Sequence, residues 1–162
     1  MTIDDYFNDD IQTKYNKKLE LFIKVSMNKK LLILDYGHGN ANSIKRSLKN
    51  FQIQTIYSNA EKEISTADAI IMPGVGHFKS AMDSMKNSNI INLLNQRALV
   101  DKIPFLGICL GFQLMTNHSE EGNCHGLEWI NTSVKKIKPR DPKKFKVPHI
   151  GWRTLNFSDN CT

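Results

Sequence analysis

Three short apolar runs, each ended by a glycine-containing turn, constrain the fold of this chain more than any other feature. The runs cover residues 31–36, 69–72 and 103–108, and stretches with helical spacing of apolar residues lie between and after them. Buried apolar strands that alternate with helices are typical of a parallel sheet covered by helices. The sequence therefore predicts an α/β fold, with an open, mostly parallel sheet and helices on both faces. Such sheets bind ligands at the carboxyl ends of their strands, where the glycine turns lie.

The other stretches of the chain locate the expected helices and the remaining strands. Helical spacing predicts helices over 41–51, 78–86, 89–100 and 109–116, and alternation predicts a short strand over 53–57. After residue 126 the strand-like stretches have no helices between them. They predict an antiparallel extension near the C-terminus, over 127–130, 132–137, 145–150 and 154–157.

Length and composition indicate the domain organisation. The chain has 162 residues, of which 40% are hydrophobic and 23% charged, and this is typical of one globular domain. Residues 1–26 begin with an acidic stretch, lack glycine and proline, and precede a second methionine, Met27. We interpret 1–26 as an N-terminal appendage and 27–162 as the domain. No signal peptide is visible and no run approaches the roughly 18 apolar residues of a membrane span, so a cytoplasmic protein without membrane contact is expected.

The cysteines and glycines carry no cofactor motif. The three cysteines, Cys109, Cys124 and Cys161, have neither CxxC nor zinc-ligand spacing. The glycine patterns that bind phosphate groups or dinucleotides are also absent from the sequence. We therefore expect no metal and no nucleotide cofactor, a reducing compartment, and one reactive thiol.

The net charge of +6 is concentrated in one segment. Residues 135–146 hold seven basic side chains and one acidic one, Asp141, so this segment accounts for the whole excess. It can be a solvated basic hairpin, a docking patch for an acidic partner protein or a phosphorylated ligand, or a nucleic-acid surface. We expect no nucleic-acid partner, because no aromatic interleaving accompanies the charge.

The third apolar run leads into Gly-Ile-Cys-Leu-Gly at 107–111, the cysteine version of a nucleophile elbow. A nucleophile on a strained strand-to-helix turn needs small neighbours, and Gly107 and Gly111 supply them. The first N–H groups and the dipole of the following helix favour the thiolate of Cys109, and the N–H of Leu110 can hold an oxyanion. The alternative is a buried cysteine between two packing glycines.

A second glycine turn, Pro-Gly-Val-Gly at 73–76, ends a buried strand just before an expected helix. Gly74 and Gly76 allow the close approach and unusual backbone angles of a turn that presents N–H donors to a developing negative charge. The alternative is a plain turn between a strand and a helix.

A cysteine nucleophile also needs a base, which is usually histidine. No histidine in this chain has the local signature of a base, so the partner of Cys109 stays unassigned at this point. The five candidates are His38, His77, His118, His125 and His149.

Five segments carry a resemblance to a known family. The chain resembles the class I (triad) glutamine amidotransferases, and among them the glutaminase subunit of imidazole glycerol phosphate synthase. The turn PGVG together with VPHIGW narrows the resemblance to that subfamily. The segments are LDYGHGNANSIKRSL at 34–48, MPGVGHFKSAM at 72–82, GICLGFQLM at 107–115, SEEG at 119–122 and VPHIGW at 147–152.

The resemblance implies a glutaminase reaction at Cys109. Cys109 would attack the side-chain amide of glutamine, form a glutamyl thioester and release ammonia. An oxyanion hole would hold the developing negative charge. Its donors would be the N–H of Leu110 and a backbone N–H from Gly74, Val75 or Gly76.

The resemblance also implies a substrate pocket and a partner face. Gln113 would help to hold the glutamine substrate, and Glu121 would belong to the same pocket. Asn40, His149 and Trp152 would lie on the face toward a cyclase subunit. That partner would use the ammonia to build the imidazole ring of histidine.

The sequence departs from the family pattern in the base and its carboxylate. The family carries both in a late His-x-Glu segment after the Gly-Trp pair, and no His-x-Glu follows Trp152 in this sequence. The earlier His118-Ser119-Glu120 has the pattern but not this place in the chain. We therefore expect a shortened chain, with the missing segment cut off or supplied by another polypeptide. These residues alone are expected to have negligible glutaminase activity, because losing a triad member costs on the order of 10³ or more in rate.

Three other functions stay open at this stage. His38 and Arg153 replace the usual family residues on the expected partner face. A related subunit whose ammonia aminates a surface sugar is therefore one alternative. The second is a truncated, non-catalytic relative. The third, another thiol hydrolase on the same sheet, is disfavoured by PGVG and VPHIGW.

Overall fold

The computed structural model describes residues 30–49, 53, 55–148 and 154 of the chain. The expected appendage at 1–26 lies outside these residues, as do His149 and Trp152. The expected strand at 154–157 lies outside them as well, apart from Thr154.

The main sheet confirms the predicted parallel architecture. Within the described residues it has four strands, all parallel, in the order β2-β1-β3-β4. The two central strands are buried along their whole length, as near-continuous apolar runs in a parallel sheet should be. The strands are β1 (Leu31–Leu34), β2 (Thr55–Ser58), β3 (Ala69–Gly74) and β4 (Phe105–Cys109).

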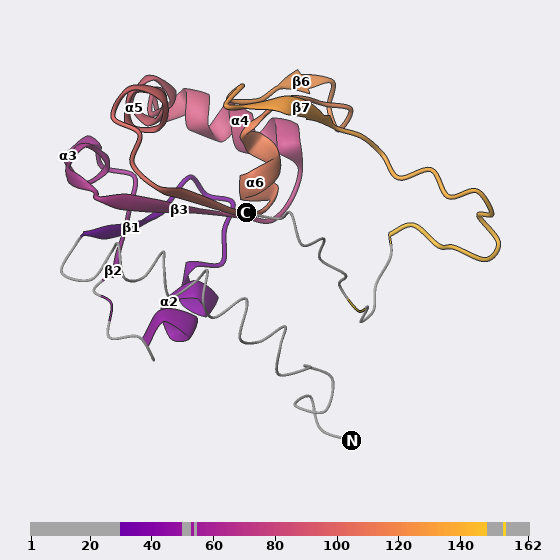
Figure 1. Cartoon of the computed structure of the whole chain (residues 1–162), viewed down its shortest axis with the longest axis horizontal. Helices are drawn as coiled ribbons and strands as arrows, with labels where there is room; N and C mark the ends of the chain where they lie inside the picture. The colour runs from indigo at the N-terminus through magenta and orange to yellow at the C-terminus, as the bar shows by residue number, and fades with distance from the viewer. Residues whose placement is uncertain (1–29, 50–52, 54, 149–153, 155–162) are drawn as a thin grey trace, which may run out of the picture.

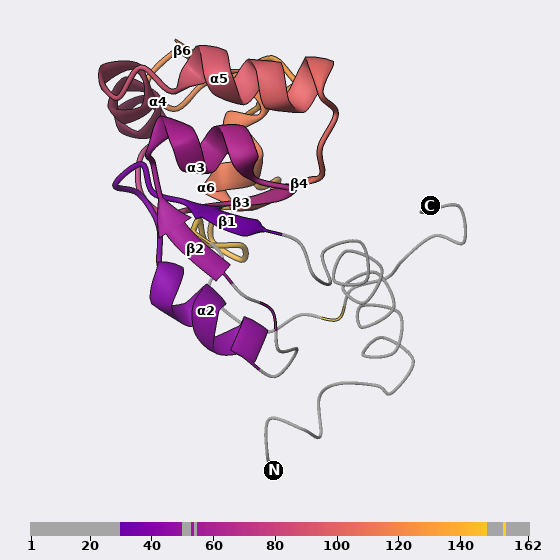
Figure 2. The same ribbon diagram turned by 90° about the vertical axis from the view of Figure 1, so that its left-hand side faces the viewer.

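Helices cover both faces of this sheet, as predicted. The helix α2 lies on one face, and α3, α4, α5 and α6 lie on the other (Figures 1 and 2). Their bounds are α2 (Ala41–Lys49), α3 (Glu61–Thr66), α4 (Phe78–Asn87), α5 (Ile91–Asn95), the π-helical turn η2 (Gln96–Val100) and α6 (Leu110–Leu114).

The alternation of side chains between the two faces of the sheet divides the core into two layers. Successive side chains of a strand point to opposite faces, so Leu31 and Ile33 pack with Leu48 of α2. Leu32 points the other way and belongs to the layer that contains Phe78 of α4. Complete burial of such side chains contributes about 1.5–3 kcal/mol each. These two layers hold the carboxyl ends of β1, β3 and β4 in place.

Two expectations about the sheet and its helices are corrected. The helix α3 was not predicted, because its six residues contain a single buried apolar side chain, Ile64, and therefore no readable period. The run at 103–108 was expected to be a buried strand. It forms β4, which is only partly buried because it is the last strand in the sheet order.

The C-terminal extension is a mixed sheet and not a purely antiparallel one. Its order is β6-β5-β7, with β5 and β6 antiparallel but β5 and β7 parallel. The strands are β5 (Thr116–Ser119), β6 (Cys124–His125) and β7 (Ile130–Val134).

The boundaries of the extension also differ from those predicted. The expected helix at 109–116 ends at Leu114, and Thr116 already belongs to β5. The expected strand at 127–130 is mostly irregular, since the Leu127 N–H donates to the Leu114 carbonyl (2.8 Å) and not to a neighbouring strand. Residues 145–148 form no strand either.

No helix in the described part of the chain is long and apolar enough to cross a membrane.

Candidate active site

The backbone of Cys109 has the strained turn expected for a nucleophile elbow. Cys109 ends β4 and immediately precedes α6, with φ 54° and ψ −116°. A non-glycine residue at positive φ is uncommon, and such strain costs on the order of 1–3 kcal/mol. The thiol is free and exposed. The alternative of a buried packing cysteine therefore does not describe Cys109.

Glycines allow this turn because backbone packs directly against backbone around it. A Cβ added at Gly107 would lie 2.5 Å from the Cα of Phe112, and one at Gly111 would lie 1.8 Å from the carbonyl oxygen of Met72. A Cβ at Gly74 would lie 2.3 Å from the Gly111 nitrogen. The predicted need for small residues at Gly107 and Gly111 is confirmed, and Gly74 shares it.

The same packing brings the second glycine turn to the nucleophile. Gly74 and Cys109 are register partners at the ends of β3 and β4. Backbone N–H groups of residues 74–76 and of Leu110 therefore lie at one edge of the sheet. The N–H of Val75 is engaged, because it donates to the His38 carbonyl at 2.9 Å. Gly76 follows with φ +110°, a conformation that favours glycine.

The dipole of α6 supports the thiolate less than expected. The sequence predicted a helix over 109–116, but α6 has five residues, Leu110–Leu114. A helix this short supplies its first-turn N–H groups and only a small macrodipole. The contribution of this segment to the oxyanion site therefore comes mainly from the Leu110 N–H.

Tyr36 links the turn after β1 to the Pro-Gly-Val-Gly turn by a hydrogen bond. No pattern in the sequence indicated this contact. The Tyr36 hydroxyl donates a hydrogen bond to the Pro73 carbonyl, and its ring stacks on His38 with the centroids 6.0 Å apart. Burial raises the pKa of Tyr36 well above its ordinary value, and the negative charge of a Cys109 thiolate raises it further. Tyr36 therefore stays protonated at neutral pH and does not act as the base.

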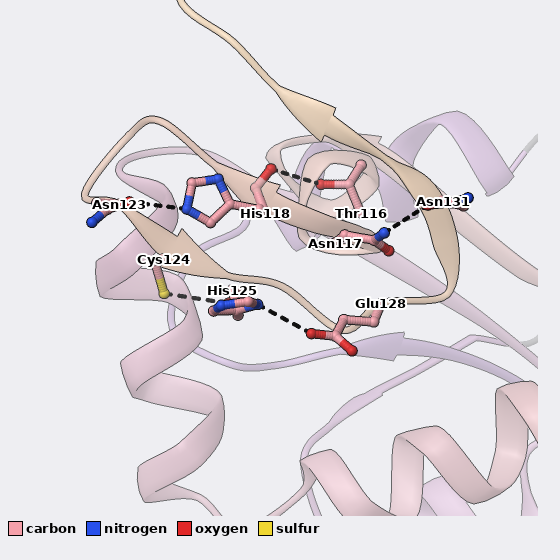
Figure 3. A network of polar contacts seen from close by, with 8 residues as sticks. All are labelled: Thr116, Asn117, His118, Asn123, Cys124, His125, Glu128 and Asn131. Carbon is pink, nitrogen blue, oxygen red and sulfur yellow. Dashed lines mark hydrogen bonds and ion pairs between the residues drawn. The ribbon is translucent and has the colours of Figure 1, made fainter.

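Three of the four described histidines have side-chain partners other than Cys109. His38 Nε2 lies 3.1 Å from the Ser84 hydroxyl. His118 and His125 face each other on β5 and β6, with ring centroids 5.6 Å apart. His118 Nε2 lies 3.0 Å from Asn123 Oδ1, and His125 Nδ1 lies 3.2 Å from Glu128 Oε1. Figure 3 shows both contacts. Among residues 30–49, 53, 55–148 and 154, no histidine is hydrogen-bonded to Cys109, so the structure assigns no base.

An open pocket of about 530 Å³ lies beside α6 and the second sheet. It brings together Gln113 and Glu121, the two residues expected to hold glutamine. Two carboxylates and two ammonium groups line it, which suits a zwitterionic ligand. The lining residues are Gln113, Glu120, Glu121, Val134, Lys135 and Lys136.

Glu121 also has a structural contact that the sequence did not indicate. Its Oε2 accepts a hydrogen bond of 2.7 Å from the N–H of Phe78, the first residue of α4. No side chain of α4 itself caps this end. The next residue, Gly122, packs so closely that an added Cβ would lie 2.9 Å from His77 Cε1. The turn between β5 and β6 therefore holds α4, and with it the end of the Pro-Gly-Val-Gly turn.

Replacing Glu121 with alanine is expected to lower the free energy of unfolding by about 1–2 kcal/mol, because a helix N-terminus loses its charged acceptor. Glu121→Gln keeps an acceptor oxygen and should lose less than half of that. Urea denaturation followed by circular dichroism measures both. Glu120→Ala, in the same turn, is the matched control, because the Glu120 carboxylate accepts from the N–H of Lys136 in the irregular segment after β7 (2.8 Å) and not from the start of a helix. Equal stabilities of Glu121→Ala and Glu120→Ala would contradict the capping role.

Asn40, expected on the partner face, is exposed and caps α2. Its Oδ1 accepts a hydrogen bond from the Ser43 N–H at 3.2 Å. This is the ordinary N-cap contact of an asparagine. The partner face therefore remains a prediction for Asn40, as it does for His149 and Trp152.

The described residues contain no group of three or more histidine, cysteine, aspartate or glutamate side chains that could hold a metal ion.

A parallel sheet with an exposed cysteine on a strained strand-to-helix turn defines an α/β protein with a cysteine nucleophile elbow. Residues 32–159 match the family model "Glutamine amidotransferase class-I", and the chain belongs to this family.

Two relatives agree with this assignment. The chain is 44% identical over 128 residues to "Imidazole glycerol phosphate synthase subunit HisH 2" of Methanococcus maripaludis, covering 79% of this chain and 62% of that protein. It is 42% identical over 125 residues to "Imidazole glycerol phosphate synthase subunit HisH" of Staphylococcus aureus, covering 77% and 62%. The chain thus spans less than two thirds of the length of these relatives.

One solved structure supports the fold alone. It is described as "Crystal structure of glutamine amidotransferase", with a TM-score of 0.57 and 16% sequence identity. The match covers 64% of this chain and 55% of that chain.

Proposed function

We propose that this chain carries the glutamine-binding and nucleophilic part of a glutaminase that supplies ammonia for imidazole glycerol phosphate synthesis. The observation that carries the proposal is the exposed Cys109 at positive φ, placed beside the Gly74–Gly76 turn. The names of the Methanococcus and Staphylococcus relatives support the choice of pathway.

In the proposed reaction, the Cys109 sulfur attacks the side-chain amide carbon of glutamine. The carbon–nitrogen bond breaks, the nitrogen takes a proton and leaves as ammonia, and a thioester remains. Water then hydrolyses the thioester to glutamate and frees the thiol. Among the described residues no histidine is hydrogen-bonded to Cys109, so we propose that the base is another group, in keeping with the absence of a His-x-Glu after Trp152.

The oxyanion of each tetrahedral intermediate needs preorganised donors. The N–H of Leu110 is one proposed donor, at the start of α6. A donor from Val75 requires that its N–H leave the His38 carbonyl, to which it is bonded at 2.9 Å. Gly74 and Gly76 flank that peptide and make such a rotation sterically possible.

The relatives are named as subunits, so we propose that this chain assembles with a cyclase subunit that receives the ammonia. Asn40, His149 and Trp152 are the proposed contacts. No cofactor is required, because both chemical steps are acyl transfers.

Labelling with the chloroketone analogue of glutamine tests the binding and nucleophile roles without requiring turnover. We expect a single modification, at Cys109, which L-glutamine slows in a concentration-dependent manner and D-glutamine does not. Intact-mass and peptide mass spectrometry measure it. Modification that L-glutamine fails to slow, or that occurs equally at another cysteine, would overturn the proposal.

A further inference from the structure

A long irregular segment leaves the second sheet after β7. Residues 135–147, here called the basic arm, form neither helix nor strand and project away from both sheets (Figure 1). Irregular segments of this length are uncommon in compact domains and are usually functional loops or linkers. Because the arm contributes little to the core, its charged and exposed side chains are the best guide to its function.

No ion pair neutralises the charge of the basic arm within the described residues, although Lys135 and Lys136 line the same pocket as Glu120 and Glu121. It holds seven basic side chains and one acidic residue, Asp141. The Asp141 side chain is hydrogen-bonded to the backbone of the arm. Its Oδ1 accepts from the N–H groups of Lys143 (2.9 Å) and Lys144 (3.2 Å). Its carbonyl accepts from the N–H of Phe145 at 2.8 Å. In the described part of the chain, no ion pair joins a base of the arm to an acid.

The same hydrogen bonds give the tip of the arm a defined shape. Asp141 closes one turn over 142–145, from which Lys143, Lys144 and Phe145 project. The Lys144 ammonium lies 5.5 Å from the centroid of the Phe145 ring. A turn that is ordered before binding reduces the entropy lost on binding.

Large apolar side chains are exposed between the charges. Ile137 is 66% exposed, Phe145 50% and Val147 43%. A purely solvated loop gains nothing from them, whereas protein interfaces combine apolar and aromatic contacts with basic side chains. A surface for single-stranded nucleic acid would need several stacking aromatics, and the arm has one. Apolar and basic residues are also not separated onto two faces of a helix, as membrane-surface helices require.

We propose that the basic arm docks on an acidic face of the subunit with which this chain assembles. The arm is followed in the sequence by Pro148 and then by His149, which is already proposed to face that subunit. The identity of the partner as a cyclase rests on the proposed function. Charge on the arm accelerates encounter, and its apolar side chains are buried in the complex.

Charge reversal in the full chain tests this proposal, with the cyclase subunit of imidazole glycerol phosphate synthase from the same organism as the probe. The test variant is Lys143→Glu/Lys144→Glu. The control is Lys62→Glu/Lys86→Glu, which changes the net charge equally at exposed positions on α3 and α4. Isothermal titration calorimetry gives the dissociation constants. Circular dichroism melting checks that both variants remain folded.

The arm variant is expected to bind at least about ten-fold more weakly than wild type, and the control less than two-fold more weakly. Binding of wild type should weaken as salt rises from about 0.05 to 0.5 M, and binding of the arm variant should weaken less. Equal binding of arm variant and wild type would overturn the arm's role and leave the proposed glutaminase intact. Absence of binding by wild type would overturn both the docking proposal and the proposed partner, while chloroketone labelling tests the glutaminase independently. Tighter arm-dependent binding to a single-stranded RNA or to anionic vesicles would overturn the choice of a protein partner.

Discussion

Replacing Cys109 with serine is expected to abolish covalent modification of this chain by the chloroketone analogue of glutamine. The thiolate sulfur displaces chloride from the reagent, and a serine hydroxyl without an adjacent base reacts far more slowly. The loss should exceed about 10³-fold in rate, comparable to removing a triad nucleophile. Peptide mass spectrometry over a time course measures it.

The chain offers a matched control for this substitution. Cys124 is buried, and its Sγ lies 3.3 Å from the His125 carbonyl oxygen, whereas Cys109 is exposed on the strained turn. Cys124→Ser should retain labelling at the wild-type rate. Iodoacetamide, which carries no glutamine-like group, should also prefer Cys109, and L-glutamine should slow this reaction too because it covers the thiol. Labelling that persists in Cys109→Ser would show that the reactive thiol lies elsewhere.

Replacing Gly111 with alanine is expected to destabilise the domain by at least about 3 kcal/mol, a large part of the usual 5–15 kcal/mol. The new Cβ would lie 1.8 Å from the Met72 carbonyl oxygen, and both groups are backbone-anchored. The end of β3 and the start of α6 would have to separate, which opens the core around Leu110 and Met72. Urea denaturation followed by circular dichroism measures the loss.

Gly37→Ala separates steric overlap from backbone strain. Gly37 has φ +82°, but an added Cβ meets nothing within 4 Å. This variant should lose only the left-handed strain, about 1–2 kcal/mol. A Gly111→Ala protein as stable as Gly37→Ala would mean that α6 moves away from β3 at little cost.

Local patterns were sufficient for the elements whose periodicity is strong. The strands β1 and β3 are buried at every position, and such runs are readable without any knowledge of their neighbours. Weak elements were missed for the same reason. The helix α3 has one buried apolar residue, and β6 is two residues long, so neither leaves a period in the sequence.

The sequence by itself determined the parallel α/β sheet and the strained cysteine turn, because burial period and glycine spacing are local properties. Tertiary structure alone decided which groups far apart in the sequence are hydrogen-bonded to each other. The Tyr36 hydroxyl donates to the Pro73 carbonyl, 37 residues away in the sequence. The Glu121 carboxylate accepts from the Phe78 N–H, 43 residues away. The Val75 N–H likewise donates to the His38 carbonyl. Each of these hydrogen bonds depends on where packing places one turn against another, and no local pattern encodes that position.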